Sequence, residues 1–328
     1  MEQEIKVSVA LISYKHAKYI RRCLDSILAQ KVNFRYEIVV GEDCSEDGTK
    51  EILLEYQEKH PDIFVLLLNE KNLGVSANGL NVAMHVRGKY ICSAESDDFW
   101  LDEYRMQKQA DYLDAHPEVA AVAGNYCSVD ENGENPRVVL SADLLDRHYT
   151  LEDYLHRGMT LHGNTIMRRS ELFPNHDEKY RRLRTAEPTM GDVITRVLLH
   201  VNGGIYAMPD MFLAHRVSYS AGTSYTEQQK TKMLEHSYMY CRIVDNISAY
   251  LDEKYDLSEL KANRTGGMLM RVLIGQRKVD RKQLRTYLRS LPPKVRRMSY
   301  RKACGKLFRL VQKRLKIKLS GARVDDLA

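Results

Sequence analysis

Long apolar runs are absent from this sequence of 328 residues. No stretch approaches the roughly 18 to 20 consecutive apolar residues that a membrane-spanning helix needs. The first four residues, Met-Glu-Gln-Glu, carry acid where a secretory signal would carry base. We therefore expect a cytoplasmic protein.

Paired cysteines are also missing. The six cysteines are scattered singly, with no Cys-x-x-Cys pair and no metal-type spacing to histidine. This spacing predicts reduced thiols rather than disulfides or a zinc site. The six are Cys23, Cys44, Cys92, Cys127, Cys241 and Cys304.

Acidic residues are scarce near the C-terminus. Residues 277–323 contain 18 Lys or Arg and a single acid, although the net charge of the whole chain is only +6. The first 276 residues are therefore mildly acidic, and the chain combines an acidic body with a strongly basic tail.

Apolar runs alternate with amphipathic segments over the first 125 residues. Because the runs are almost continuously apolar, they are typical of strands in a parallel sheet that is covered on both faces. The predicted strands are 5–13, 36–42, 63–69, 89–94 and 119–123, and the predicted helices are 16–30, 46–59, 76–86 and 101–116. The pattern loosens up to about residue 217, and residues 224–318 are typical of helices, with Pro292-Pro293 as the one clear break.

Glycine is missing from the loop that follows the first strand. Open α/β sheets bind ligands at the carboxyl ends of their strands, and residues 13–17 lack the Gly-x-Gly-x-x-Gly turn of dinucleotide-binding proteins. A Gly-x-x-x-x-Gly-Lys-Ser/Thr phosphate loop is absent too. These absences exclude a typical dehydrogenase and most simple NTPases.

Carboxylates stand at these strand ends instead: Glu42 and Asp43 after the second strand, then Glu95, Asp97 and Asp98 after the fourth. Such a cluster repels a bare diphosphate but holds a hard divalent cation well. The sequence therefore predicts a site for Mg²⁺ or Mn²⁺ that could bridge to phosphates.

Four motifs, in order and at family spacing, resemble glycosyltransferase family 2 enzymes with the GT-A fold. They are Val7 to Ser13 with residues 14–20, EIVVGEDCSEDGTKEIL (37–53), NEKNLGVSANGLNVA (69–83) and GKYICSAESDDFW (88–100). The resemblance implies a GT-A domain over residues 1–220, with a nucleotide-sugar half (1–125) and an acceptor half (126–220). A helical region, 221–328, would follow. Glu-x-Asp-Asp-aromatic-Trp followed by Gln107-Lys108-Gln109 resembles a bacterial branch associated with surface polysaccharide synthesis.

The resemblance places Glu95-Ser96-Asp97 where the family has Asp-x-Asp, at the donor diphosphate. It implies a metal, Mn²⁺ or Mg²⁺, held by Asp97, Asp98 and Glu95, with His215 and its neighbour Arg216 reaching in from a closing loop that includes Ser218, Ser220, Gly222 and Ser224. The chain departs from the family in having Glu at the first motif position and Ala77-Asn78-Gly79 where Ala-Arg-Asn is frequent. Asp97 and Asp98 could alternatively cap the following helix.

Further donor contacts are implied for Asp43, Ser13, Tyr14, Lys71 and Asn78. By resemblance Asp43 would bind the base or ribose, and the Tyr14 ring would lie against the base. An ordinary turn acid and a strand-end aromatic remain the alternatives at these two positions.

Inverting transfer requires a general base next to the acceptor hydroxyl. Asp192, in EPTMGDVITRVLLHV (187–201), resembles the family's acceptor-motif aspartate, and Glu187 is the second choice. His162 and Asn164 could touch sugar hydroxyls. Trp100 would form either a sugar platform or part of the core.

A basic amphipathic helix is predicted over residues 294–318. Its apolar face would carry Tyr300, Cys304, Leu307, Phe308, Val311 and Leu315, opposite Lys302, Lys306, Arg309, Lys313 and Lys316. The helix would either lie on anionic lipid or pack its apolar stripe on the body. No nucleic acid partner is expected, because no recognition motif accompanies the charge.

These features together predict an inverting, metal-dependent glycosyltransferase. The donor would be a nucleoside-diphosphate sugar, UDP-linked, and the acceptor a saccharide that is free or lipid-linked at the inner face of the cytoplasmic membrane. A sugar nucleotidyltransferase is a rival, although it would carry a glycine-rich first loop. A non-catalytic nucleotide-sugar sensor or membrane scaffold is the other rival, and the helical region could mediate oligomerisation.

Overall fold

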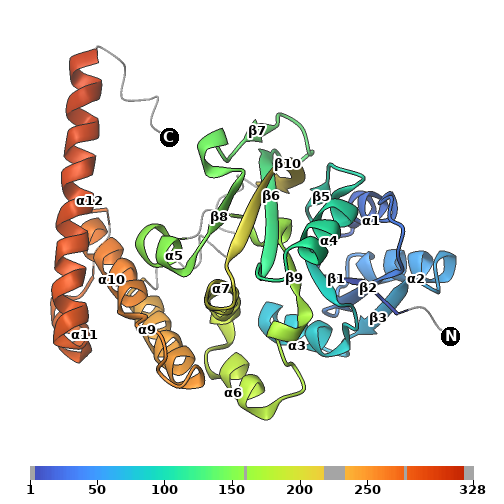
Figure 1. Ribbon diagram of the computed structural model, residues 1–328, viewed down its shortest axis with the longest axis horizontal. Helices are drawn as coiled ribbons and strands as arrows, with labels where there is room; N and C mark the ends of the chain where they lie inside the picture. The colour runs from blue at the N-terminus through green and yellow to red at the C-terminus, as the bar shows by residue number, and fades with distance from the viewer. Residues whose placement is uncertain (1–3, 159–160, 218–232, 277–278, 321–328) are drawn as a thin grey trace. The chain divides into compact units, whose positions relative to one another are not determined.

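The computed structural model describes residues 4–158, 161–217, 233–276 and 279–320. The chain divides into two compact units, Met1–Ser220 and Ala221–Ala328 (Figure 1). The first unit is an α/β sheet with flanking helices, and the second is helical in its described part. This arrangement confirms the predicted fold class.

The first unit contains a ten-stranded mixed sheet. Its central path runs in the order β3-β2-β1-β4-β9-β6-β10-β5, with β7 paired to β6 and β8 paired to β10. The strands are β1 (Val7–Ser13), β2 (Tyr36–Glu42), β3 (Phe64–Leu68), β4 (Tyr90–Glu95), β5 (Phe99–Trp100), β6 (Ala121–Val129), β7 (Arg137–Val138), β8 (Arg147–Tyr149), β9 (Met167–Arg169) and β10 (Ile205–Arg216).

Seven α-helices and four short 3₁₀ turns accompany the described part of this sheet. The α-helices are α1 (Ile20–Leu28), α2 (Thr49–Lys59), α3 (Val75–His85), α4 (Arg105–Ala115), α5 (Leu151–Arg157), α6 (Glu178–Ala186) and α7 (Gly191–Val201). The 3₁₀ turns are Ala142–Leu144, Gly163–Thr165, Ser170–Leu172 and Pro188–Met190.

Strands β1 to β4 are parallel to one another, as predicted, whereas the second half of the sheet is mixed. Strand β9 lies antiparallel between β4 and β6, and β10 runs parallel to β6 but antiparallel to β5 and β8. The carboxyl ends of β1, β2 and β4 therefore lie at one edge, next to the end of β10.

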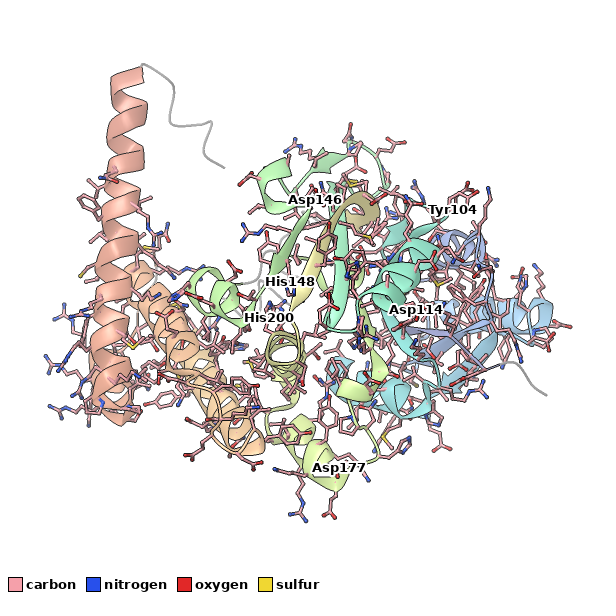
Figure 2. All side chains as sticks on the ribbon, viewed as in Figure 1. Tyr104, Asp114, Asp146, His148, Asp177 and His200 are labelled. Carbon is pink, nitrogen blue, oxygen red and sulfur yellow. The ribbon has the colours of Figure 1, made fainter. Side chains whose placement is uncertain are left out.

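Helix ends are set by specific side chains. Asp177, labelled in Figure 2, accepts the backbone N–H of Tyr180 at 2.8 Å and starts α6. Asp114 on α4, also labelled, accepts from Lys89 Nζ and from the Tyr90 hydroxyl, both at 2.6 Å. The Asp114 contacts tie α4 to the start of β4.

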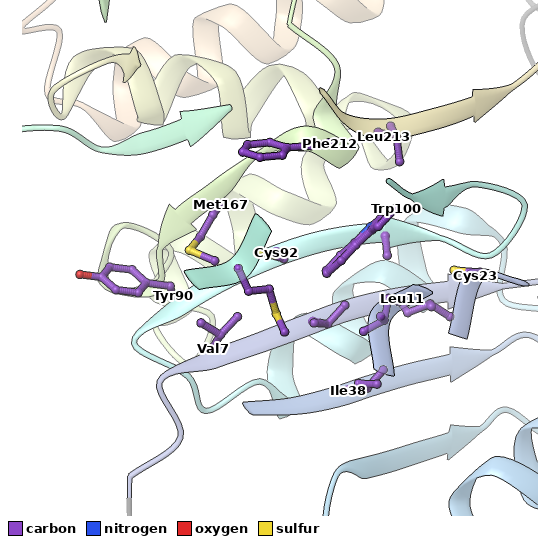
Figure 3. Packing of buried hydrophobic residues seen from close by; sticks show 14 of the residues in the cluster. Val7, Leu11, Cys23, Ile38, Tyr90, Cys92, Trp100, Met167, Phe212 and Leu213 are labelled. Atoms are coloured by element: carbon purple, nitrogen blue, oxygen red, sulfur yellow. The ribbon is translucent and has the colours of Figure 1, made fainter. Parts of the chain in front are cut away.

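The core lies between the sheet and helices such as α1 and α4. Val7, Leu11 and Cys92 point from neighbouring strands into the cluster that Figure 3 shows, and Cys23 of α1 covers it. The side chain of Trp100 belongs to the same cluster and is only 6% exposed. Trp100 is therefore a core residue, and the predicted sugar platform is wrong.

Several element boundaries differ from the prediction. Helix α1 begins at Ile20 instead of residue 16, and the backbone N–H groups of His16 and Ala17 donate to the side chains of Thr49, at the start of α2, and of Asp47. Helix α4 begins at Arg105 instead of residue 101, because Phe99 and Trp100 pair with β10. Such pairings across the sheet leave no periodic signal in the sequence.

The second unit contains four described helices: α9 (Met233–Tyr250), α10 (Ser258–Leu273), α11 (Arg281–Ser290) and α12 (Pro293–Ser320). Their shared core includes Ala262, Tyr287, Val295 and Ala303. The predicted break at Pro292-Pro293 is confirmed, but two further breaks separate α9 from α10 and α10 from α11.

Two expectations from the composition can be compared with this structure. All six cysteines are free thiols, as predicted. Among the described residues, no helix has the length and apolar character needed to cross a membrane.

Candidate functional site

Asp98 lies at the centre of a buried polar cluster beyond the end of β4. A turn in which its N–H donates to the Glu95 carbonyl at 3.1 Å directs the side chain inward. Its carboxylate accepts the backbone N–H of Arg216 at 2.9 Å and the Asn164 amide at 3.1 Å, and it lies 3.1 Å from His215 Nδ1. Because Arg216 and His215 end β10, the cluster joins the two halves of the sheet.

Asp98, His162 and His215 form a group that could hold a metal ion. Each offers one ligand atom, and these atoms all lie within 4.8 Å of one another. The two imidazole rings are 4.5 Å apart between centroids. The hydrogen bond to Asp98 raises the pKa of His215, whereas burial and the charge of His215 lower the pKa of His162 to about 4. His162 therefore stays neutral at physiological pH, as a metal ligand must be.

Glu95 and Asp97 add negative charge next to this group. Desolvation by the surrounding protein and the charges of Asp98 and Asp97 raise the pKa of Glu95 to about 7. Glu95 is nevertheless exposed, so water reduces the desolvation of its carboxylate. Repulsion between the carboxylates therefore contributes more to the raised pKa of Glu95 than burial alone would suggest. Desolvation and the charge of Asp98 likewise raise the pKa of Asp97. A cation would relieve this repulsion.

The donor set fits a divalent cation. Carboxylate oxygens suit Mg²⁺ and Mn²⁺, whereas imidazole nitrogens favour transition metals over Mg²⁺. Asp98 and His215 were predicted as ligands, and the structure brings them together with His162, which was predicted on the acceptor side instead. Asp97 and Glu95 lie beside the group but are not part of it.

His16 is a site residue that was not predicted from the sequence. Its Nδ1 lies 2.6 Å from the hydroxyl of the buried Ser96, and its Nε2 lies 4.0 Å from Asp97. The only sequence signal was its position in the loop after the first strand. His16 links this loop to the acidic stretch.

Ser13 ends β1 at the same edge of the sheet, and Tyr14 follows it. Within the described part of the chain, the buried hydroxyl of Ser13 has no hydrogen-bond partner, although its residue is only 3% exposed. Tyr14 is exposed. A buried hydroxyl without a partner is costly, and a polar ligand atom would satisfy it.

Asp43 and Asn78 are buried and already hydrogen-bonded within the protein. The Asp43 carboxylate accepts the backbone N–H groups of Leu73 at 2.8 Å and Gly74 at 2.9 Å. Asn78 donates to the Gly41 carbonyl at 2.8 Å and so fastens α3 to β2. Lys71, in the loop that Asp43 holds, is exposed.

Asp192 lies in the first turn of α7, is exposed and forms an ion pair with Arg196 at 3.3 Å. The charge of Arg196 contributes to the lowered pKa of His162, so this end of α7 lies within electrostatic reach of the cluster. Glu187, the second candidate for the base, is buried.

Two arginines donate hydrogen bonds to backbone carbonyls of residues in or next to the cluster. Buried Arg105 stacks over Trp100 and donates to the Asn164 carbonyl at 2.6 Å, while Arg216 donates to the Asp97 carbonyl at 2.8 Å. Arg105 was not singled out from the sequence, because nothing in a helix pattern marks such a buried cation. The predicted closing-loop residues Ser218, Ser220, Gly222 and Ser224 lie outside the described residues.

A family comparison agrees with this arrangement. The family model described as Glycosyl transferase family 2 matches residues 8–173, which is just over half of the chain. The chain therefore belongs to glycosyltransferase family 2. The resemblance that the four motifs carry is confirmed at this level.

Sequence relatives match about a third of the chain. An uncharacterized protein of Mycobacterium tuberculosis is 40% identical over 112 residues, which are 34% of this chain and 32% of that protein. The putative teichuronic acid biosynthesis glycosyltransferase TuaG of Bacillus subtilis is 32% identical over 107 residues, 33% of this chain and 41% of TuaG. The chain thus spans less than half the length of these relatives.

Solved structures resemble the chain over nearly its whole length. TarS 1–349 of S. aureus, in complex with UDP-GlcNAc, superposes with a TM-score of 0.63 at 17% identity, over 98% of this chain and 93% of TarS 1–349. At this identity the likeness establishes the shared fold.

Proposed function

We propose that the chain is an inverting, metal-dependent glycosyltransferase that transfers a sugar from UDP to a saccharide or lipid-linked acceptor in bacterial surface polysaccharide synthesis. One observation carries the proposal: the Asp98, His162 and His215 group, with two further carboxylates, at the carboxyl end of β4. Family membership supports the reaction class, and the names of TuaG and of the UDP-GlcNAc complex of TarS support the pathway type and the donor.

Asp98, His215 and His162 would hold the cation, with Asp97 and Glu95 as further oxygen donors. When bound, a divalent cation at this position would neutralise the charge of the departing diphosphate. Since two of the three grouped ligands are imidazoles, we propose Mn²⁺ ahead of Mg²⁺.

The donor would lie across the carboxyl ends of β1, β2 and β4. The Ser13 hydroxyl would hydrogen-bond to it, the Tyr14 ring would lie against the base, and Lys71 and Ser96 would contact it from neighbouring loops. The contacts of Asp43 and Asn78 favour an indirect role for both, in shaping the wall of this site rather than binding the base.

Asp192 would act as the general base. Its exposed carboxylate would accept the acceptor's proton as the new glycosidic bond forms, because a single displacement at the anomeric carbon requires that proton to leave. The ion pair with Arg196 would orient it at the start of α7.

The experiment is a calorimetric titration with UDP, with and without Mn²⁺. We expect binding that depends on the metal and that weakens at least about tenfold in Asp98→Asn and Asp97→Asn, because each variant removes negative charge at the cation site. Asp111→Asn, an exposed position on α4, is the matched control and should bind like the wild type.

Asp192→Asn separates binding from catalysis. It should bind UDP normally and lose transfer to a saccharide acceptor, since as general base its carboxylate would contact the acceptor and not the donor. Absence of UDP binding with and without the metal would refute the UDP donor. Binding without transfer by the wild type, whichever acceptor is supplied, would favour a nucleotide-sugar sensor or scaffold.

A further inference from the structure

Helix α12 is held against α10 by the face that carries Lys302 and Lys306. Val295, Ser299 and Ala303 are buried there. Lys302 forms an ion pair with Glu259 at 2.9 Å, and Lys306 Nζ lies 3.4 Å from the Asn263 carbonyl.

The orientation of α12 about its own axis is therefore fixed by buried contacts. At Gly266 of α10, an added Cβ would meet Lys302 Cβ at 2.7 Å and the Ser299 carbonyl oxygen at 2.9 Å. The two helices approach so closely that α12 cannot roll its other face inward without losing this packing.

The opposite face of α12 carries large apolar side chains in solvent. Tyr300, Phe308 and Val311 are 49%, 63% and 46% exposed. This stripe does not pack on α10, because the face with Lys302 and Lys306 occupies α10 instead. Large exposed apolar side chains on one helix face mark an interaction surface.

Basic side chains flank the same stripe. Arg297 and Arg301 are exposed, and the sequence contains no Asp or Glu between residues 281 and 324. A second copy of this face would set like charges against each other. Apolar and aromatic side chains edged by arginine match an anionic bilayer surface, where rings enter the interface and guanidinium groups meet phosphates.

We propose that the outer face of α12, formed by Arg297, Tyr300, Arg301, Phe308 and Val311, binds the surface of an anionic lipid bilayer. The helix lies in the plane of the interface, with Tyr300, Phe308 and Val311 directed into it. This contact would hold the proposed transferase beside a lipid-linked acceptor. It does not depend on the transferase reaction, since it involves neither donor nor metal.

The test is co-sedimentation of the full chain with vesicles, without nucleotide or metal. Phosphatidylcholine vesicles that contain roughly 30 mol% phosphatidylglycerol should bind the protein at least about tenfold more strongly than pure phosphatidylcholine vesicles, and added salt should weaken this binding. Tyr300→Ser with Phe308→Ser should reduce the partition at least about tenfold.

Two matched controls isolate the face. Leu54→Ser with Leu273→Ser removes exposed apolar side chains elsewhere and should leave the partition unchanged. Replacing Arg297 and Arg301 by Gln should weaken binding more than replacing Arg281 and Lys282 of α11, which are also exposed.

Three outcomes would overturn the proposal. One is no binding to the anionic vesicles. Another is wild-type binding by the Tyr300/Phe308 variant. The third is equal loss in both arginine sets together with tighter binding to single-stranded RNA, which would assign the face to nucleic acid. None of these outcomes bears on UDP binding, so the transferase proposal is judged separately.

Discussion

Asp43 shows, at the scale of the residue, how one carboxylate holds a loop. It accepts two backbone N–H groups and the Asn69 amide, all from the segment that connects β3 to α3. We expect Asp43→Asn to lower the free energy of unfolding by about 2 kcal/mol, because the amide nitrogen would face a buried donor. Urea denaturation, followed by the fluorescence of Trp100, measures this change.

Lys71→Ala is the control for Asp43→Asn, since it changes an exposed side chain of the same loop. It should shift the free energy of unfolding by less than about 0.5 kcal/mol. If Asp43→Asn kept full stability and weakened only UDP binding, the carboxylate would face the nucleotide, as the family resemblance implies.

The acidic stretch shows what residue types alone can predict. Because Glu95, Asp97 and Asp98 directly follow a buried strand, we predicted that their carboxylates would lie together at the edge of the sheet. In the structure they lie close enough for the charges of Asp97 and Asp98 to raise the pKa of Glu95. Which of them meets His215 depends on one turn and on a strand about 120 positions later in the chain. No local pattern encodes such a contact, so the sequence could not single out Asp98 from Asp97 and Glu95.

The close approach of α10 and α12 gives a prediction at the scale of the element. Gly266→Ala should destabilise the helical unit by on the order of 2 kcal/mol, because its Cβ would overlap Lys302 Cβ and the Ser299 carbonyl. Gly305→Ala on α12 has no atom within 4 Å of its Cβ and should stabilise the helix by up to about 1 kcal/mol. Urea denaturation followed by far-UV circular dichroism compares the two.

Equal effects of Gly266→Ala and Gly305→Ala would mean that α10 and α12 do not pack as described. Both substitutions remove a glycine from a helix, so propensity alone would stabilise both. Only the contact with Ser299 and Lys302 gives them opposite signs.

Elements differ in how much of them a sequence can reveal. Strand β2 was predicted with its true ends, because its apolar run is bounded by polar turns. Helix α12 was predicted as a helix, but the sequence left open which of its faces would pack. In the structure the packed face carries small residues and lysine stems, which fit against Gly266 better than aromatic rings would: Ser299, Ala303, Lys302 and Lys306. The size of the side chains at the contact, and not their polarity, therefore determined which face of α12 packs against α10.

At the scale of the whole molecule, the first unit should be sensitive to acid. Burial lowers the pKa of His200, labelled in Figure 2, to about 4, and that of His162 likewise. An unfolded chain protonates these rings near pH 6.5, so their neutral burial stabilises the fold fully above about pH 6.5 and progressively less as the pH falls towards 4.

We therefore expect His200→Phe, which keeps a ring against Tyr154, to reduce this loss of stability. Between about pH 7 and about pH 4.5 the difference from the wild type should be on the order of 2 kcal/mol, read from Trp100 fluorescence in urea. His85→Phe is the control, because the exposed His85 also contacts the carbonyl four residues earlier in its helix. Identical slopes for all three proteins would contradict the buried neutral imidazole.

Strand β10 has a consequence for the order in which the molecule is built. It supplies His215 and the backbone N–H of Arg216 to Asp98, which precedes them by more than a hundred residues. During synthesis, β1 to β4 leave the ribosome long before β10, and contacts of such sequence separation form slowly. The hydrogen bonds around Asp98 can therefore form only after β10, the last described strand of the sheet, has been synthesised.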